Sequence, residues 1–162
     1  MNIDLKKLSI PALLNLYASI LDELREKECV RSSNAPTGDY AEYLFKHIMK
    51  WELENNSNCA FDAVDQKTKN RYQIKSRRLT KRNSSRLVQI RGDGFDFVAA
   101  ILFNQDFSVK RAVIIPKKVV LDNSKHSDHT NAKQFYLKDE ILKLSEVIDV
   151  TQKFQKFAEN HT

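Results

Sequence analysis

The sequence predicts an α/β protein in which a mixed β-sheet is flanked by helices. Three observations favour this class: helical periodicity before residue 55, two alternating segments at residues 61–64 and 72–75, and a nearly continuous apolar run at residues 95–103. A length of 162 residues suits one domain with one core. We find no internal repeat and no long linker, so we expect the whole chain, residues 1–162, to form a single domain.

The first expected helix covers residues 9–28. Ser9 suits the N-cap and Pro11 suits the first turn. Apolar residues then recur at helical spacing along one side: Leu13, Leu14, Tyr17, Ile20, Leu21 and Leu24. This apolar side could pack on the sheet or against a second copy of the chain, and the sequence leaves both possibilities open.

The second expected helix covers residues 39–54 and has two apolar stripes, so we expect it to be covered on two sides. One stripe is Tyr40, Leu44, Ile48 and Trp51, and the other is Phe45, Met49 and Leu53. Glu42 stands at the head of the second stripe, where it would be partly buried. The alternative is an ordinary surface ion pair between Glu42 and Lys46, four residues further on.

The next expected unit is a β-hairpin. Residues 61–64 and 72–75 alternate between apolar and polar side chains, and the polar residues 65–70 between them suit a hairpin connection. The hairpin places an acidic residue on one strand beside an amide and a cation on the other: Asp62, Gln73 and Lys75.

The faces of these strands follow from the period of two. Gln73 and Lys75 share one face of the second strand. Asp65 competes with Asp62 as the acidic residue, but its odd offset puts it on the opposite face or in the turn, where Asp is common. Asp62, flanked by apolar neighbours, is the better-buried choice. Taken alone, Gln73 and Lys75 could also be the exposed polar face of an edge strand.

The remaining chain alternates strands with short helical segments. We expect, in order, a short helix at residues 85–91, a buried central strand at 95–103, a strand at 109–115, a helical turn after Pro116, a polar loop at 122–133, a short strand at 134–137 and helical segments from residue 139 onward.

The composition is that of a soluble globular protein, with 41% hydrophobic and 30% charged residues. No apolar run approaches the roughly 20 residues that a membrane helix needs. We expect no membrane partner, no secretory signal and a cytoplasmic location. The two cysteines, Cys29 and Cys59, lack a metal-binding spacing, and we expect free thiols rather than a disulfide.

The charge is unevenly distributed, which suggests a polyanionic partner. The net charge is +6, yet residues 67–91 contain ten cations and no acid, so the rest of the chain is slightly acidic. A run of one sign attached to the second hairpin strand can neutralise phosphates and position a duplex. The residues that we expect to contact DNA are Arg77, Arg78, Lys81, Arg82, Arg86 and Arg91.

Asp62 followed by Gln73-x-Lys75 resembles the PD-(D/E)xK superfamily of restriction-endonuclease-like nucleases, in the variant where Gln replaces the second acid. The order of the expected elements agrees with the core of that superfamily. The resemblance implies a restriction-endonuclease-like fold with an N-terminal amphipathic helix in residues 1–30, a catalytic core in residues 38–121 and a C-terminal strand and helix region in residues 134–162.

The resemblance also implies the chemistry of the site. Asp62, Glu42 and Gln73 would hold Mg²⁺, or Mn²⁺ in its place, together with the main-chain carbonyl of Ile74. Lys75 would stand beside the attacking water and complete the catalytic set. Because Gln replaces an acid, we expect weaker metal binding than in the acidic variant.

His126 and His129 have a spacing that could chelate a metal on a helix, but their segment has the composition of a loop and no further ligand accompanies them. We therefore give them no catalytic role and expect surface residues.

We predict a Mg²⁺-dependent DNA endonuclease of restriction type that acts on double-stranded DNA, with the homodimer that the resemblance suggests. The alternative is a DNA-binding module that keeps the fold without turnover, and a third, weaker hypothesis is an RNA-directed protein. Base-reading residues would lie in residues 77–91 or 122–133.

Overall fold

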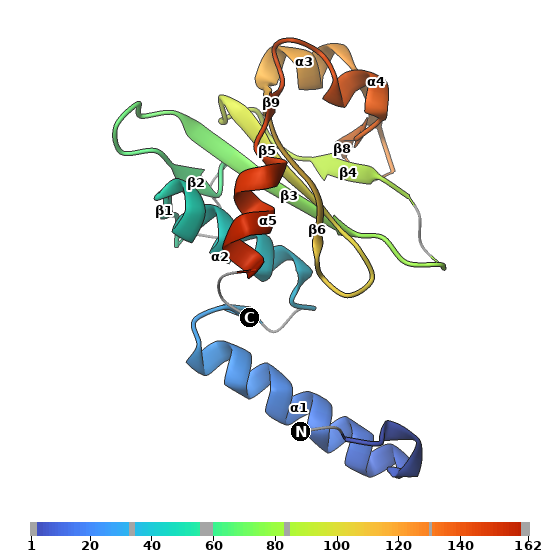
Figure 1. The fold of residues 1–162 in the computed structure, drawn as a ribbon. Coiled ribbons are helices and arrows are strands. Elements are labelled where there is room, and N and C mark those ends of the chain that lie inside the picture. Colours follow the sequence, from blue (N-terminus) through green and yellow to red (C-terminus); the bar gives the residue numbers. More distant parts are fainter. Residues whose placement is uncertain (1–2, 33–34, 56–59, 83–84, 130, 160–162) are drawn as a thin grey trace.

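The computed structural model describes residues 3–32, 35–55, 60–82, 85–129 and 131–159. A six-stranded mixed sheet forms its centre, in the order β1-β2-β3-β5-β6-β9, and a separate three-stranded sheet has the order β4-β8-β7 (Figure 1). The predicted class, a mixed sheet flanked by helices, is confirmed. None of the helices in the described ranges has the length and apolar character to cross a bilayer.

The predicted hairpin forms one end of the large sheet. Strands β1 (Glu52–Leu53), β2 (Ala63–Val64) and β3 (Arg71–Arg78) are antiparallel neighbours, and Ala63 is paired with Tyr72. The turn between β2 and β3 bends through Lys69, which has a left-handed φ of 62°. This arrangement brings the acidic strand next to the strand that carries the amide and the lysine.

The apolar run is the central strand, as predicted. Strand β5 (Phe97–Phe103) lies parallel to β3 on one side and antiparallel to β6 (Val109–Pro116) on the other. Alternate side chains of β5 enter two separate cores, one on each face of the sheet, and they are almost wholly buried. A strand covered on both faces cannot show polar alternation, which explains the continuous apolar sequence.

Different elements cover the two faces of the large sheet. Helices α2 (Thr37–Met49) and α5 (Thr151–Glu159) cover one face, and the small sheet with α3 (Lys117–Asp122) and α4 (Asp139–Leu142) packs on the other. Helix α2 is anchored by Leu44, Phe45 and Ile48, which are buried. The ring of Phe45 lies 4.7 Å from that of Phe154 in α5, so the two helices share one core.

The N-terminal part of the chain differs from this layered body. A short 3₁₀ helix, η1 (Leu5–Lys7), precedes α1 (Ile10–Glu26), which begins at the predicted N-cap, because Ser9 Oγ accepts a hydrogen bond from the Ala12 N–H at 3.4 Å. Helix α1 projects away from the sheets (Figure 1) and contains no buried residue.

Four predictions of elements or of their bounds are wrong, each for a physical reason. The second helix ends at Met49 instead of residue 54, because Lys50 takes a left-handed φ of 61° and the chain turns into β1. The expected helix at residues 85–91 is a strand, β4 (Leu87–Ile90), because Val88 and Ile90 alternate into the core while Gln89 faces solvent.

The other two corrections concern the C-terminal third. The expected loop at 122–133 contains strand β7 (Ser124–Ser127), which pairs with β8 (Ala132–Tyr136). Ile148 belongs to strand β9 (Ile148–Asp149) rather than to a helix, because it adds to the free edge of β6. The helical turn after Pro116 is confirmed as α3. Cys29 is a free thiol, and Cys59 lies outside the described residues.

Candidate active site

Asp62 lies where β2 stops pairing with β3. Its backbone N–H donates to the Tyr72 carbonyl at 2.8 Å, and its carboxylate Oδ2 accepts the N–H of Ile74 at 2.6 Å. The side chain therefore takes the place that the next residue of a partner strand would occupy. Since an extended residue points its N–H and its C=O to the same side, the Ile74 carbonyl faces the same edge as Asp62.

Beyond this point, that edge of β3 carries no neighbouring strand in the part of the chain that the structure describes. The partners of Arg71 and Tyr72 are in β2, whereas β3 continues to Arg78. The edge from Ile74 onward is thus available for side chains and for a ligand.

Gln73 is buried with a partly unsatisfied side chain. It is only 5% exposed, and its Nε2 donates to the Arg91 carbonyl at 3.0 Å. Its Oε1 is buried without a hydrogen-bond partner. A buried amide oxygen without a partner costs free energy, and a bound cation or an ordered water would supply the missing interaction.

Lys75 follows on the same face of β3 and is partly buried. Burial is the largest influence on its pKa and lowers it, while the carboxylates of Asp62 and Glu42 raise it and Arg91 lowers it. The ammonium group therefore lies within electrostatic range of both acids. Since burial favours the neutral amine, the proton on Lys75 is easier to remove than the proton on an exposed lysine.

Glu42 reaches this edge from helix α2. The first residue of α2 is tied to β3, because the Ser76 hydroxyl donates to the Thr37 carbonyl at 3.1 Å. Burial and then the nearby charge of Asp62 raise the pKa of Glu42 to about 7, although Arg31, whose Nη1 lies 3.4 Å from the Glu42 Oε2, opposes this shift. Near neutral pH Glu42 is therefore partly protonated, mainly because it is buried.

The geometry separates Asp62 from Asp65. Asp65 is half-buried at the start of the turn, where its Oδ1 accepts the Lys67 N–H at 2.8 Å, and this bond is the main reason that its pKa is lowered. Asp65 therefore caps the hairpin turn, and Asp62 lies close to the other site residues. Glu42 is partly buried as expected, and its ion-pair partner is Arg31 rather than Lys46.

The oxygen atoms at this site are of the kind that binds a hard divalent cation, although they are few. Among the described residues, no three His, Cys, Asp or Glu side chains gather to hold a metal ion. A cation here would depend on two carboxylates, the Gln73 amide oxygen, the Ile74 carbonyl and water. Mg²⁺ commonly takes only one or two carboxylates and keeps several waters, so oxygen ligands of this kind suit it.

The basic residues expected to contact DNA fall into two groups. Three are tied into the protein: Arg77 donates to the Leu87 carbonyl at 2.9 Å, Arg78 lies 4.2 Å from the centre of the Phe107 ring, and Arg86 pairs with Asp139 at 2.6 Å. The remaining three, Lys81, Arg82 and Arg91, are exposed. Two cations of the basic run therefore pair with acids from distant parts of the chain, Arg86 with Asp139 and Arg71 with Asp96.

Sequence reasoning missed two features of the site. One is Arg31, eleven residues before Glu42, at a spacing that no helix or strand pattern would identify. The other is the small sheet, which joins both segments considered for base reading, because Gln89 of β4 is paired with Gln134 of β8, and Gln134 with Lys125 of β7. The His126 Nε2 lies 3.1 Å from the Asp128 Oδ1 on the surface.

Comparison with known proteins adds a resemblance to a solved structure. A scan against protein-family models and a search of curated protein sequences both find no match. Among solved structures, the chain is similar to a bacterial homing endonuclease, I-Ssp6803I, with 15% sequence identity and a TM-score of 0.45, over 81% of this chain and 99% of that chain. At this level of similarity the activity of the neighbour does not transfer, and function has to be inferred from the side chains of this chain.

Proposed function

We propose that this chain is a Mg²⁺-dependent DNA endonuclease of restriction type, with Asp62, Glu42, Gln73 and Lys75 as its catalytic residues. The observation that carries the proposal is the convergence of two carboxylates, a partly buried lysine and the unpartnered Gln73 oxygen at the open edge of β3. Each of these features is unfavourable in an empty site, and each becomes favourable when a divalent cation and a phosphate occupy it.

The four residues would have different roles in cleavage. Asp62 and Glu42 would hold the cation together with the Gln73 amide and the Ile74 carbonyl, and Glu42 would become fully ionised on binding it. When bound, Mg²⁺ polarises the phosphate and lowers the pKa of a ligated water. Lys75 would donate hydrogen bonds to the attacking water and position it, and it would stabilise the negative charge that develops on the phosphate.

Double-stranded DNA would lie over the exposed cations and the small sheet. Lys81, Arg82 and Arg91 are free to contact phosphates, whereas Gln89, Gln134 and Lys125 form a polar row across three strands. Gln and Lys side chains can hydrogen-bond to base edges in the major groove, which accepts a β-ribbon. Arg91 directly follows β4 and its carbonyl accepts the Gln73 amide, so this surface continues into the site.

A second candidate function is a DNA-binding module without turnover. It is favoured by Gln73, since an amide in place of an acid removes one of the negative charges that bind a metal. Such a module would bind DNA in a salt-dependent manner and would be indifferent to Mg²⁺ and to Asp62.

The test is cleavage of methylated and unmethylated plasmid DNA by the full chain with Mg²⁺, Mn²⁺ or EDTA. We expect cleavage that needs the metal and falls by roughly 10² to 10⁴-fold in Asp62→Asn and in Lys75→Met, since positioned acids, bases and charge-stabilising groups contribute this much. The matched control is Asp65→Asn, which removes an aspartate of the same hairpin from outside the site and should retain cleavage.

DNA binding measured on the same variants separates the two functions. If Lys75→Met cuts as well as the wild-type protein, the proposed mechanism is wrong. If the wild-type protein binds DNA in a salt-dependent manner, cuts none of the substrates with either metal, and binds equally well as Asp62→Asn, the chain is a binding module.

A further inference from the structure

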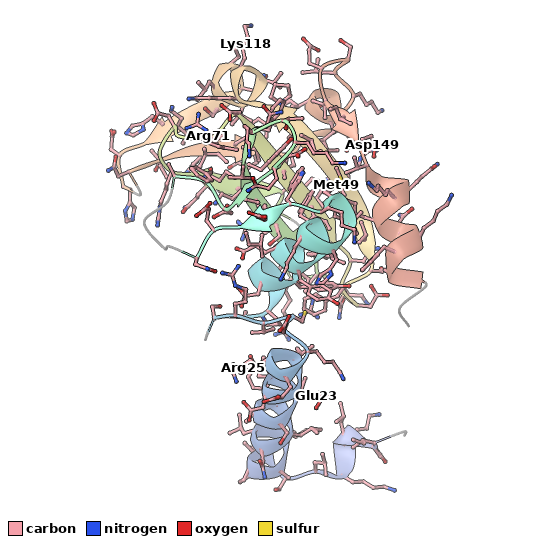
Figure 2. The ribbon with its side chains drawn as sticks, turned by 90° about the vertical axis from the view of Figure 1, so that its left-hand side faces the viewer. Glu23, Arg25, Met49, Arg71, Lys118 and Asp149 are labelled. Carbon is pink, nitrogen blue, oxygen red and sulfur yellow. The ribbon has the colours of Figure 1, made fainter. Side chains whose placement is uncertain are left out.

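Helix α1 has a strongly apolar side that the chain itself does not cover. Of the ten large hydrophobic residues that are exposed in the described chain, seven lie between Ile3 and Ile20, and five of these are in α1. Ile10 is 76% exposed, Leu14 64% and Tyr17 52%. Figure 2 shows α1, with Glu23 and Arg25 labelled near its end, standing apart from the layered body.

Such a helix is not stable by itself in water. A helix of 17 residues is marginal as an isolated element, and helices in proteins gain most of their stability by burying an apolar face. A contiguous apolar surface of this kind on a soluble protein normally marks an interaction site. We therefore expect a partner to bury the apolar side of α1.

The order of the apolar residues identifies the kind of partner. Seven apolar residues form one seam: Ile10, Leu13, Leu14, Tyr17, Ile20, Leu21 and Leu24. Their successive spacings are three, one, three, three, one and three, so the seam reads the same from either end around Tyr17. Within it, Ile10, Leu14, Tyr17, Leu21 and Leu24 alternate in steps of four and three, as in a coiled coil. In an antiparallel pair with a twofold axis at Tyr17, Ile10 would face Leu24 of the other copy. Every seam residue would then meet an apolar residue.

The charges at the two ends of α1 favour the same antiparallel arrangement. Residues 3–9 contain one more cation than acids, whereas residues 22–28 contain two more acids than cations. In the antiparallel pair the basic segment before α1 of each copy would lie near the acidic end of α1 of the other copy. In a parallel pair the two acidic ends would instead face each other, and the two helix dipoles would also be aligned unfavourably.

We propose that α1 is a homodimerisation element and that the partner is the α1 helix of a second copy of this chain, packed antiparallel along the seam. The contact is isologous, because each helix presents the same surface to the other. This inference rests on α1 alone and not on the proposed nuclease activity.

The test is the mass of the full chain by sedimentation equilibrium at several micromolar concentrations. We expect a reversible dimer with twice the chain mass of 18.8 kDa. The variant with both Leu14→Glu and Ile20→Glu should be monomeric, whereas the matched control with Asn15→Glu and Ser19→Glu, on the opposite side of α1, should remain dimeric. Circular dichroism and the unfolding midpoint of the body keep a folding defect distinct from a loss of association.

Cross-linking then tests the orientation, in a background of Cys29→Ser and Cys59→Ser. We expect a disulfide-linked dimer under mild oxidation when Ile10→Cys and Leu24→Cys chains are mixed, and little when either is oxidised alone. Self-cross-linking of Ile10→Cys alone would instead indicate a parallel pair and would contradict the proposed geometry.

Two outcomes of the mass measurement would overturn the proposal. One is a single-chain mass at all concentrations. The apolar side of α1 would then have no second copy to cover it and would have to pack on its own body, for instance at the hollow of about 880 Å³ between Leu24 at the end of α1 and Tyr43 and Phe157 of the body. The other is a dimer that survives the double seam substitution, because another surface would then form it.

Discussion

Helices α1 and α2 have similar amphipathic sequences, but only α2 packs its apolar residues against the rest of the chain. Helix α2 lies on the large sheet and buries Ala41, Leu44, Phe45 and Ile48, whereas α1 buries no residue. The difference does not lie in helix-forming tendency, since both helices form. It lies in what each apolar stripe meets: a sheet of the same chain for α2, and solvent or a second chain for α1.

This comparison also distinguishes two uses of a polar side chain on a helix. Glu42 of α2 is partly buried beside Asp62, and its pKa is raised to about 7. Glu23 of α1 is exposed and forms an ordinary pair with Lys27 at 2.6 Å, four residues further on. A polar residue on a packed helix can thus become part of a site, while one on an exposed helix mainly improves solubility and helix stability.

The largest expected effect on the free energy of unfolding comes from removing a buried side chain from the apolar stripe of α2. Phe45→Ala should lower the free energy of unfolding by about 3–5 kcal/mol, because it removes a buried aromatic ring that packs against Trp51 and Phe154. Leu14→Ala in α1, measured by urea unfolding at a concentration where the chain is monomeric, should change it by less than about 0.5 kcal/mol. Equal losses in the two variants would mean that α1 is packed against its own body in solution.

The sequence alone was sufficient for much of this comparison. The periodicity predicted α1 with its cap, the hairpin and the central strand, because each depends on residues that are neighbours in the sequence. The partners of each face could not be predicted, because they are set by tertiary packing. The same limit applies to Arg31, which tertiary packing brings beside Glu42. The strand Leu87–Ile90, predicted as a helix, is too short for its periodicity to distinguish the two structures.

An intermediate effect concerns the pH dependence that Glu42 gives to the fold. Its pKa is raised from 4.5 to about 7 in the folded chain, so the folded state binds this proton more tightly than the unfolded state. The contribution of Glu42 to the free energy of unfolding is therefore fully present below pH 4.5 and is lost as the pH rises through about 7. Glu42→Gln, which mimics the protonated form, should remove this dependence.

Above the pKa of Glu42, the Glu42→Gln variant should be more stable than the wild-type chain by about 1–3 kcal/mol, since each pKa unit corresponds to about 1.4 kcal/mol and partial exposure reduces the effect. Below pH 4.5 the two proteins should be nearly equal. Urea unfolding over this pH range, without divalent cations, measures the difference. Glu26→Gln on the exposed helix α1 is the control and should change nothing. A wild-type curve parallel to that of Glu42→Gln would show that Glu42 is solvated.

The smallest effect on the body, and a specific one on α1, is expected from Ser9→Ala. Ser9 caps α1 through the Ala12 N–H, and loss of such a cap costs roughly 1 kcal/mol. If α1 is stabilised mainly by pairing with a second copy, both helices of the dimer lose their cap, and the dissociation constant should rise by roughly 30-fold. Sedimentation equilibrium measures this change, and Ser9→Asp, which restores a capping oxygen, should recover most of the affinity. The unfolding midpoint of the body should stay constant, because α1 contributes no buried residue to it. An unchanged dissociation constant together with a destabilised body would show that α1 belongs to the same cooperative unit as α2.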